Sequence, residues 1–304
     1  MKKNYGFTLA EGATHVAHCS DVHSDFRGWS NAFTHVAHCH NKRLFGFTLA
    51  EVLITLGIVG VVAAMTLPAL IQNYQKKTWV EGLKIGVSIL EQGFRQAMAE
   101  DGVDDLGDTT LWKNCNGDDF SYDSSEWRDK CQPELSKYFK GIKYESVPDM
   151  QAAGDTTNII TDTATCNKLV GKTNKWYYLN DKSKCRGWKN IAVTLSNGMR
   201  ADMIVGSDAG YTAGAITALD VNGGKGPNTW GRDTFYLMIL RNGRVVGNYS
   251  KAEAEAYAKY NNRDISSTVE NFKTQRETQC NKTTTEEGTA CSSRVIDEGW
   301  VMNY

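Results

Sequence analysis

One long apolar stretch near the N-terminal end departs from the polar character of the rest of the chain. Residues 52–71 read VLITLGIVGVVAAMTLPALI and carry no charge, whereas the mean hydropathy of the whole chain is −0.44. Extended back to Phe47, the stretch has 25 residues and a single charged side chain, Glu51. As a helix it would rise roughly 37 Å, which is enough to cross the hydrocarbon core of a bilayer. The pattern predicts a transmembrane helix over residues 47–71.

The helical pattern continues beyond this stretch but becomes one-sided. Apolar residues recur at intervals of three and four, while most charged residues lie off that line. We therefore expect an amphipathic continuation of the helix over residues 72–101, ending near Gly102, with a bend or a loosening at Pro68. The apolar stripe is expected to pack on the protein's own soluble domain, and it consists of Trp79, Leu83, Val87, Leu90, Phe94 and Ala97.

Residues 102–304 have the pattern of a soluble head domain. Asn-Gly pairs at 197–198 and 242–243 each join two strand-like runs, and such pairs are strong hairpin signals. We expect four of the runs to form an antiparallel meander with one apolar face against the helix, so the fold class is α+β. Ser250 is expected to cap a short helix, and the remaining tail to be rich in loops. The strand-like runs are Lys175–Leu179, Ile191–Leu195, Met199–Val205, Thr234–Leu240 and Arg244–Gly247.

The composition narrows the chemistry that the head could perform. The net charge is −1, which gives no electrostatic reason to expect nucleic acid as a partner. All six histidines precede residue 41, so histidine-dependent triads and H-E-x-x-H zinc sites are excluded from the rest of the chain. No G-x-S-x-G motif occurs. Hydrolysis by a pair of carboxylates is the enzymatic alternative that stays open.

The head contains six cysteines at short separations. An even number in a chain with the features of an exported protein predicts three disulfides. Free thiols or a zinc site are the alternative, which is less favoured because the chain has no C-x-x-C pair. Other connectivities are open, but the simplest one is sequential: Cys115–Cys131, Cys166–Cys185 and Cys280–Cys291.

Glu51 is unusual because it lies five residues into the apolar stretch. A carboxylate in lipid is costly unless it has a partner. Cleavage between Gly46 and Phe47 would create a cationic α-amino group on Phe47, which could pair with Glu51 of a neighbouring copy. A cleaved secretory signal fits less well, because its apolar core has about 7–15 residues and it would not grade into an amphipathic helix.

Residues 42–68, KRLFGFTLAEVLITLGIVGVVAAMTLP, resemble the N-terminal signature of type IV pilins and type II secretion pseudopilins. The resemblance implies that a prepilin peptidase cuts after Gly46 and methylates the new N-terminus at Phe47. It also implies that Glu51 serves assembly and that Pro68 is the helix-bending proline of the family. The expected fold is then pilin-like, with a long N-terminal helix packed on a small antiparallel sheet and disulfide-closed loops.

The expected leader, residues 1–46, is longer than is usual in this family. GFTLAE occurs at residues 6–11 and 46–51, and THVAHC at residues 14–19 and 34–39. Removing residues 12–51 would leave an ordinary six-residue basic leader, so we interpret the stretch as a gene-level insertion or a start assigned too far upstream. Its histidines and cysteines make a zinc site the alternative. Cleavage after Gly46 would remove them.

One loop of the head is rich in oxygen ligands. Asp, Asn and Gly alternate over residues 220–233, and such oxygens suit a hard cation such as calcium. Some pseudopilins carry calcium in a comparable loop. The alternative is that these side chains only make turns and cap backbone groups. No cofactor is otherwise expected, and the candidate calcium ligands are Asp220, Asn222, Asn228 and Asp233.

The resemblance implies a structural subunit rather than an enzyme, in four segments: a leader (1–46), a transmembrane helix (47–71), its amphipathic continuation (72–101) and a head (102–304). Its expected partners are prepilin peptidase, other pilin-like subunits, the inner-membrane assembly platform and the lipid bilayer. The filament would be a type II secretion pseudopilus or a type IV pilus, with the head in the periplasm or outside the cell. The alternative is a membrane-anchored adhesin, or a carboxylate-dependent hydrolase, with a pilin-like anchor.

Overall fold

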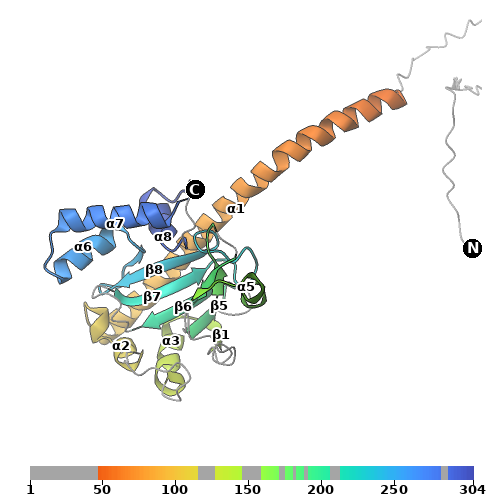
Figure 1. Cartoon of the computed structure of the whole chain (residues 1–304). Coiled ribbons are helices and arrows are strands. Elements are labelled where there is room, and N and C mark those ends of the chain that lie inside the picture. Colours follow the sequence, from red (N-terminus) through yellow and green to blue (C-terminus); the bar gives the residue numbers. More distant parts are fainter. Residues whose placement is uncertain are drawn as a thin grey trace, which may run out of the picture. The chain divides into compact units, whose positions relative to one another are not determined.

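The computed structural model describes residues 47–115, 127–145, 159–170, 175–180, 183–187, 191–205, 213–281 and 287–304. The described residues fall into two units, residues 47–66 and the described part of 67–304. Helix α1 (Leu49–Asp101, 53 residues) runs through Pro68 without a break, and the predicted bend there stays a prediction (Figure 1). Gly102, with φ +66°, follows its last residue, as expected. The leader and its zinc hypothesis lie outside the described residues.

Within the first unit, α1 has no buried side chain between Leu49 and Thr66. Large apolar residues on every side of the helix are exposed; Leu53 and Ile58, for example, are 61% and 60% exposed. A helix that is apolar all round needs an apolar environment. This part of α1 therefore depends on lipid or on other apolar segments for its burial.

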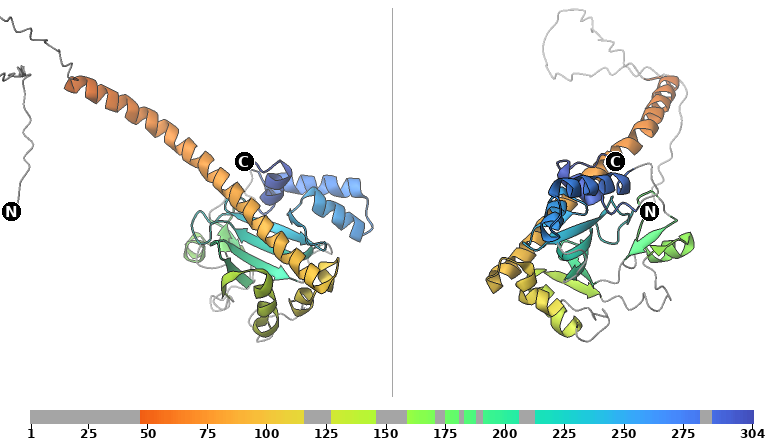
Figure 2. Two further views of the ribbon diagram at one scale, coloured as in Figure 1. Left: turned by 180° about the vertical axis from the view of Figure 1, so that it is seen from behind. Right: turned by 60° about the vertical axis from the view of Figure 1, so that its left-hand side comes forward.

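Within the second unit, α1 packs across a sheet, as Figure 2 shows from behind. The predicted stripe is confirmed: Leu83, Leu90, Phe94 and Ala97 are completely buried, and the Trp79 and Val87 side chains pack partly buried against the same core. The Phe94 ring meets Phe139 edge-on, with centroids 5.0 Å apart.

Glycines bring the helix close to the sheet. A methyl group on Gly86 would overlap the side chain of Leu219, and one on Gly82 would lie 2.9 Å from Cβ of Val221. Side chains at these two positions, one turn apart, would push helix and sheet apart. Their absence explains how the backbone of α1 approaches so closely.

The main sheet has six antiparallel strands in the order β1-β5-β6-β7-β8-β9. The apolar side of these strands forms one core with α1. The fold class expected from the sequence, a long helix on an antiparallel sheet, is confirmed. The strands are β1 (Gly141–Glu145), β5 (Ile191–Leu195), β6 (Arg200–Val205), β7 (Ala213–Asp220), β8 (Thr234–Leu240) and β9 (Val245–Gly247).

Both Asn-Gly hairpins are confirmed. Gly198 (φ +84°) turns β5 into β6, and Gly243 (φ +76°) turns β8 into β9. Glycine is favoured at these positions because the left-handed region carries a steric cost for residues with a Cβ.

The four hairpin strands lie in the main sheet as expected, but the prediction missed β1 and β7. Strand β7 reads AGAITALD, whose alanines and glycine have low strand propensity; it forms because β6 and β8 pair with it on both sides. Residues 175–177 form β3, which belongs to a separate three-stranded sheet with β2 (Ile159–Ile160) and β4 (Cys185–Gly187).

The tail after β9 is more helical than expected. The predicted helix α6 (Lys251–Tyr260) is present, with Ser250 Oγ accepting a hydrogen bond from the Glu253 amide. The expectation of a loop-rich remainder was wrong, because α7 (Ile265–Gln279) and α8 (Cys291–Asp297) follow. Helix α7 is polar on most sides, so its sequence lacks an apolar stripe, and it is instead fixed by packing on α6.

Short helical segments occupy the rest of the described head. After α1 come the 3₁₀ turn η1 (Leu106–Asp108), α2 (Thr110–Cys115), the π turn η2 (Trp127–Cys131) and α3 (Gln132–Tyr138). Helix α5 (Thr163–Leu169) precedes β3. The short helices after α1 agree with the loops and short helices expected before residue 146.

Candidate functional site

The start of α1 is a capping box made by Thr48 and Glu51. The Thr48 amide and hydroxyl both donate to Glu51 Oε2 at 2.8 Å, and the Glu51 amide donates to Thr48 Oγ1 at 3.2 Å. The carboxylate thus satisfies an amide at the end of the helix that would otherwise lack a partner. The T-x-x-E pattern is readable in the sequence, but Thr48 was not among the predicted site residues.

Phe47 precedes this box and is 88% exposed. Gly46, the expected cleavage position, lies outside the described residues. The structure therefore describes one side of the expected processing site: an accessible Phe47, followed directly by a capped helix.

Helix α1 passes the length and hydropathy criteria for a membrane span, and no other helix of the described chain does so. The 18-residue window that meets them is 0% buried in the protein. This lack of burial distinguishes α1 from the core helix of a water-soluble domain, in which protein would cover the apolar window.

The three disulfides are the sequential pairs Cys115–Cys131, Cys166–Cys185 and Cys280–Cys291, with sequence separations of 16, 19 and 11 residues. Each therefore closes a short loop. Cys280 follows α7 and Cys291 begins α8, so their bond joins the ends of two consecutive helices.

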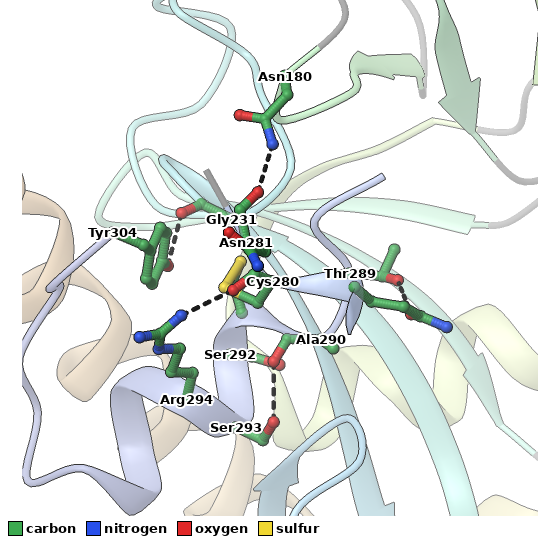
Figure 3. Close-up of a disulfide and its surroundings, with 12 residues drawn as sticks. Asn180, Gly231, Cys280, Asn281, Thr289, Ala290, Ser292, Ser293, Arg294 and Tyr304 are labelled. Atoms are coloured by element: carbon green, nitrogen blue, oxygen red, sulfur yellow. Dashed lines mark hydrogen bonds between the residues drawn. A yellow bond between two sulfur atoms is a disulfide. The ribbon is translucent and has the colours of Figure 1, made fainter. Parts of the chain in front are cut away.

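Figure 3 shows how the surroundings of this disulfide anchor the tail. The Arg294 guanidinium donates to the Cys280 carbonyl at 2.8 Å, and the Tyr304 hydroxyl donates to the Gly231 carbonyl at 2.7 Å. Lys76 of α1 donates to the Tyr304 carbonyl at 2.6 Å. The tail is thereby bound both to the β7–β8 loop and to α1.

The β7–β8 loop gathers the four candidate calcium ligands around Asp233. The Asp233 carboxylate is buried and accepts hydrogen bonds from the amides of Asn228 and Thr229, each at 2.7 Å, and from Asn222 Nδ2 at 3.2 Å. The Asn222 amide donates to Asp220 Oδ1 at 3.2 Å. Burial raises the pKa of Asp233, and the donated hydrogen bonds partly offset this effect.

The donor set fits a hard cation only in part. The amide oxygens Oδ1 of Asn222 and of Asn228 are buried without a hydrogen-bond partner, which is unusual for polar atoms. Asp233, in contrast, already organises the loop through three N–H donors. Among the described residues, no group of three or more His, Cys, Asp or Glu side chains is placed to hold a metal ion.

Comparison with known proteins yields one match. Residues 41–67 match the family described as the prokaryotic N-terminal methylation motif. No curated protein and no solved structure matches the chain. The motif implies processing by prepilin peptidase and pilus assembly, and with the apolar half of α1 it indicates a membrane-anchored, exported protein. The chain thus carries the type IV pilin and pseudopilin signature at residues 41–67 and is prepilin-like.

Proposed function

We propose that the chain is a structural subunit, not an enzyme, of a helical filament: a type II secretion pseudopilus or a type IV pilus. The observation that carries the proposal is the coincidence of the methylation motif with a helix that is apolar and unburied in its first unit but packed on a sheet in its second. Such a helix can serve as a membrane anchor before assembly and as filament core afterwards.

Processing comes first in the proposed sequence of events. Peptidase cleavage after Gly46 frees the α-amino group of Phe47, which is methylated and remains cationic. The subunit then waits in the inner membrane with its head in the periplasm. The assembly platform extracts it, and lipid contacts of residues 47–71 are replaced by contacts with the same helices of other subunits.

Glu51 can serve its own helix and a neighbour at the same time. Both Thr48 donors use Oε2, and no described residue donates to Oε1. We assign Oε1 to the Phe47 ammonium of the neighbouring subunit, which would set the register between the helices. In lipid, this pair offsets the cost of burying each charge alone.

The mature N-terminus tests this proposal directly. Mass spectrometry of the protein extracted from host membranes should give a peptide that starts with N-methylated Phe47. An uncut Gly46–Phe47 bond in all of the protein would contradict the proposal and favour a permanently anchored adhesin or hydrolase.

We also propose calcium as a ligand of the β7–β8 loop, supported by the two unpartnered amide oxygens of Asn222 and Asn228. Asp220 would complete the set, with Asp233 holding the loop in place. Calorimetric titration of the detergent-solubilised full chain with calcium should release heat, and Asp220→Ala should abolish it. Wild-type protein that gives no heat would end the proposal.

A further inference from the structure

A groove of about 460 Å³ lies where the tail helices meet the turn between β8 and β9. Helices α6 and α7 form its walls, with α8 at one end, and Figure 1 shows these helices together in blue beside the sheet. Its charged lining residues are Arg244, Lys251, Glu255, Lys273, Arg276 and Asp297. Four cations and two carboxylates give this described lining a net charge of about +2.

The positive charge of the groove is only partly neutralised. Arg276 Nη1 lies 3.0 Å from Asp297 Oδ2, a close pair. Lys251 Nζ lies 3.7 Å from Glu255 Oε1, and Lys273 pairs at 3.6 Å with Glu270, outside the groove. The Arg244 side chain is exposed and has no ion pair with any described residue. Arg244 can therefore bind a ligand carboxylate or sulfate directly, and Lys273 can exchange its long, exposed pair with Glu270 for one at little cost.

An aromatic ring is held in the same groove by unusual backbone geometry. Tyr249 has φ +60°, a left-handed conformation that is uncommon for an aromatic residue. Its amide donates to Glu253 Oε2 at 2.6 Å, and its ring packs edge-on against Phe272 at 5.5 Å. These contacts fix the position of a half-buried ring beside the cations.

We propose that this groove binds an acidic sugar, such as a chain of uronic acid residues. Arg244 and Lys273 would bind its carboxylates, the Tyr249 ring would pack against a sugar face, and Glu255 would accept hydrogen bonds from hydroxyl groups. A nucleic acid duplex is disfavoured because it carries about one charge per 1.7 Å of its axis, which the small net positive charge of this lining would neutralise poorly. The binding site goes beyond the proposed filament role and does not depend on it.

The test is calorimetric titration of the detergent-solubilised full chain with trigalacturonate, with neutral maltotriose and a 12-base-pair DNA duplex as comparison ligands. The double variant Arg244→Gln/Lys273→Gln should weaken trigalacturonate binding at least about tenfold, because it removes two charge-assisted hydrogen bonds to the ligand carboxylates. The matched control is Arg263→Gln/Lys259→Gln, which removes one arginine and one lysine from the same helical hairpin but outside the groove. The control should bind as wild type does.

Glu255→Gln separates sugar recognition from simple attraction of anions. It should weaken trigalacturonate binding, because an amide offers one hydroxyl acceptor fewer than a carboxylate. If charge alone held the ligand, the same change would strengthen binding. Stronger binding by Glu255→Gln, equal losses in both double variants, equal affinity for the DNA duplex, or no binding by wild type would each overturn the proposal.

Discussion

The two parts of α1 on either side of residue 66 contain the same kinds of apolar residue but use them differently. Before it, leucine, isoleucine and valine lie on every side and are exposed, and this exposure continues to Tyr74; from Trp79 onward, most apolar residues form one stripe buried against the sheet. The spacing of polar residues, rather than overall hydrophobicity, makes the difference. The first part is adapted to partners outside its own unit, and the second to its own sheet.

The largest effect is expected for the glutamate of the unburied part. Glu51→Ala should leave cleavage and export intact, because the cut lies at Gly46, but should abolish incorporation into filaments. Glu51→Gln keeps an acceptor for Thr48 while removing the charge, so it should keep the capped helix and still fail to assemble. Immunoblots of sheared filaments and of membranes measure both steps.

Glu91, in the packed part of α1, is the matched control for this prediction. Its Oε1 accepts the Val245 amide at 3.0 Å, a contact within the head. Glu91→Ala should cost about 1 kcal/mol of head stability and leave assembly intact. Normal incorporation of Glu51→Ala would disprove the assigned role.

A large effect on folding is expected only in the packed part. Phe94→Ala removes a completely buried ring and should destabilise the head by about 3–5 kcal/mol. Leu56→Ala removes a side chain that is 63% exposed and should leave head stability unchanged. Urea unfolding of both variants in detergent, followed by tryptophan fluorescence, measures the difference in stability. Similar losses of stability in the two variants would refute the distinction between an unburied and a packed part of α1.

Glu253 should make head stability depend on pH. Burial raises its pKa to about 8, although the amides of Tyr249 and Ser250 lower it in part. Between pH 4.5 and 8 the unfolded chain has released this proton while the folded chain retains it, so the folded state loses stability as the pH rises. The loss amounts to roughly a few kcal/mol at about 1.4 kcal/mol per pKa unit.

Unfolding of the Glu253→Gln variant tests whether Glu253 causes this pH dependence of head stability. Glutamine can still accept the Tyr249 amide but does not titrate. The free energy of unfolding should fall between pH 5 and pH 8.5 in the wild type, and less steeply in the variant. Equal slopes would assign the pH dependence to other groups, among them Asp233, whose raised pKa acts in the same direction.

The smallest of these effects compares two glycines of the same helix. Gly86→Ala places a methyl group against Leu219 and should cost about 1–3 kcal/mol. Gly60→Ala meets nothing within 4 Å and should be neutral or slightly favourable to the helix. Thermal unfolding of the two variants measures the difference, and a cost that is equal at both positions would argue against close packing at Gly86.

Features encoded by local sequence patterns were predictable. The long helix, its buried stripe, both Asn-Gly hairpins and α6 follow from periodicity, turn chemistry and capping residues that lie within a few positions of one another. The missed elements depend on distant partners instead. Strand β7 is formed by its pairing with β6 and β8, and α7 by its packing on α6.

The candidate sites also divide into those that local sequence patterns indicate and those that depend on tertiary contacts. The methylation motif and the Thr48–Glu51 box are contiguous in sequence, so residue types at fixed spacing were enough to indicate them. Whether Asp233 binds a cation or organises its loop was not decidable from the interleaved Asp, Asn and Gly, because that depends on where each oxygen points. The fold shows three N–H groups donating to it.

The sequence by itself determined that this chain carries a processing motif on an apolar helix and an amphipathic continuation beyond it, because helical periodicity and peptidase recognition are both local. Only the tertiary structure decided which strands lie beside which, how closely α1 approaches the sheet at Gly86, and that Arg244, Tyr249 and Lys273 share one groove. These outcomes depend on contacts between residues far apart in the chain, and the energy of such contacts cannot be inferred from the sequence of one segment alone.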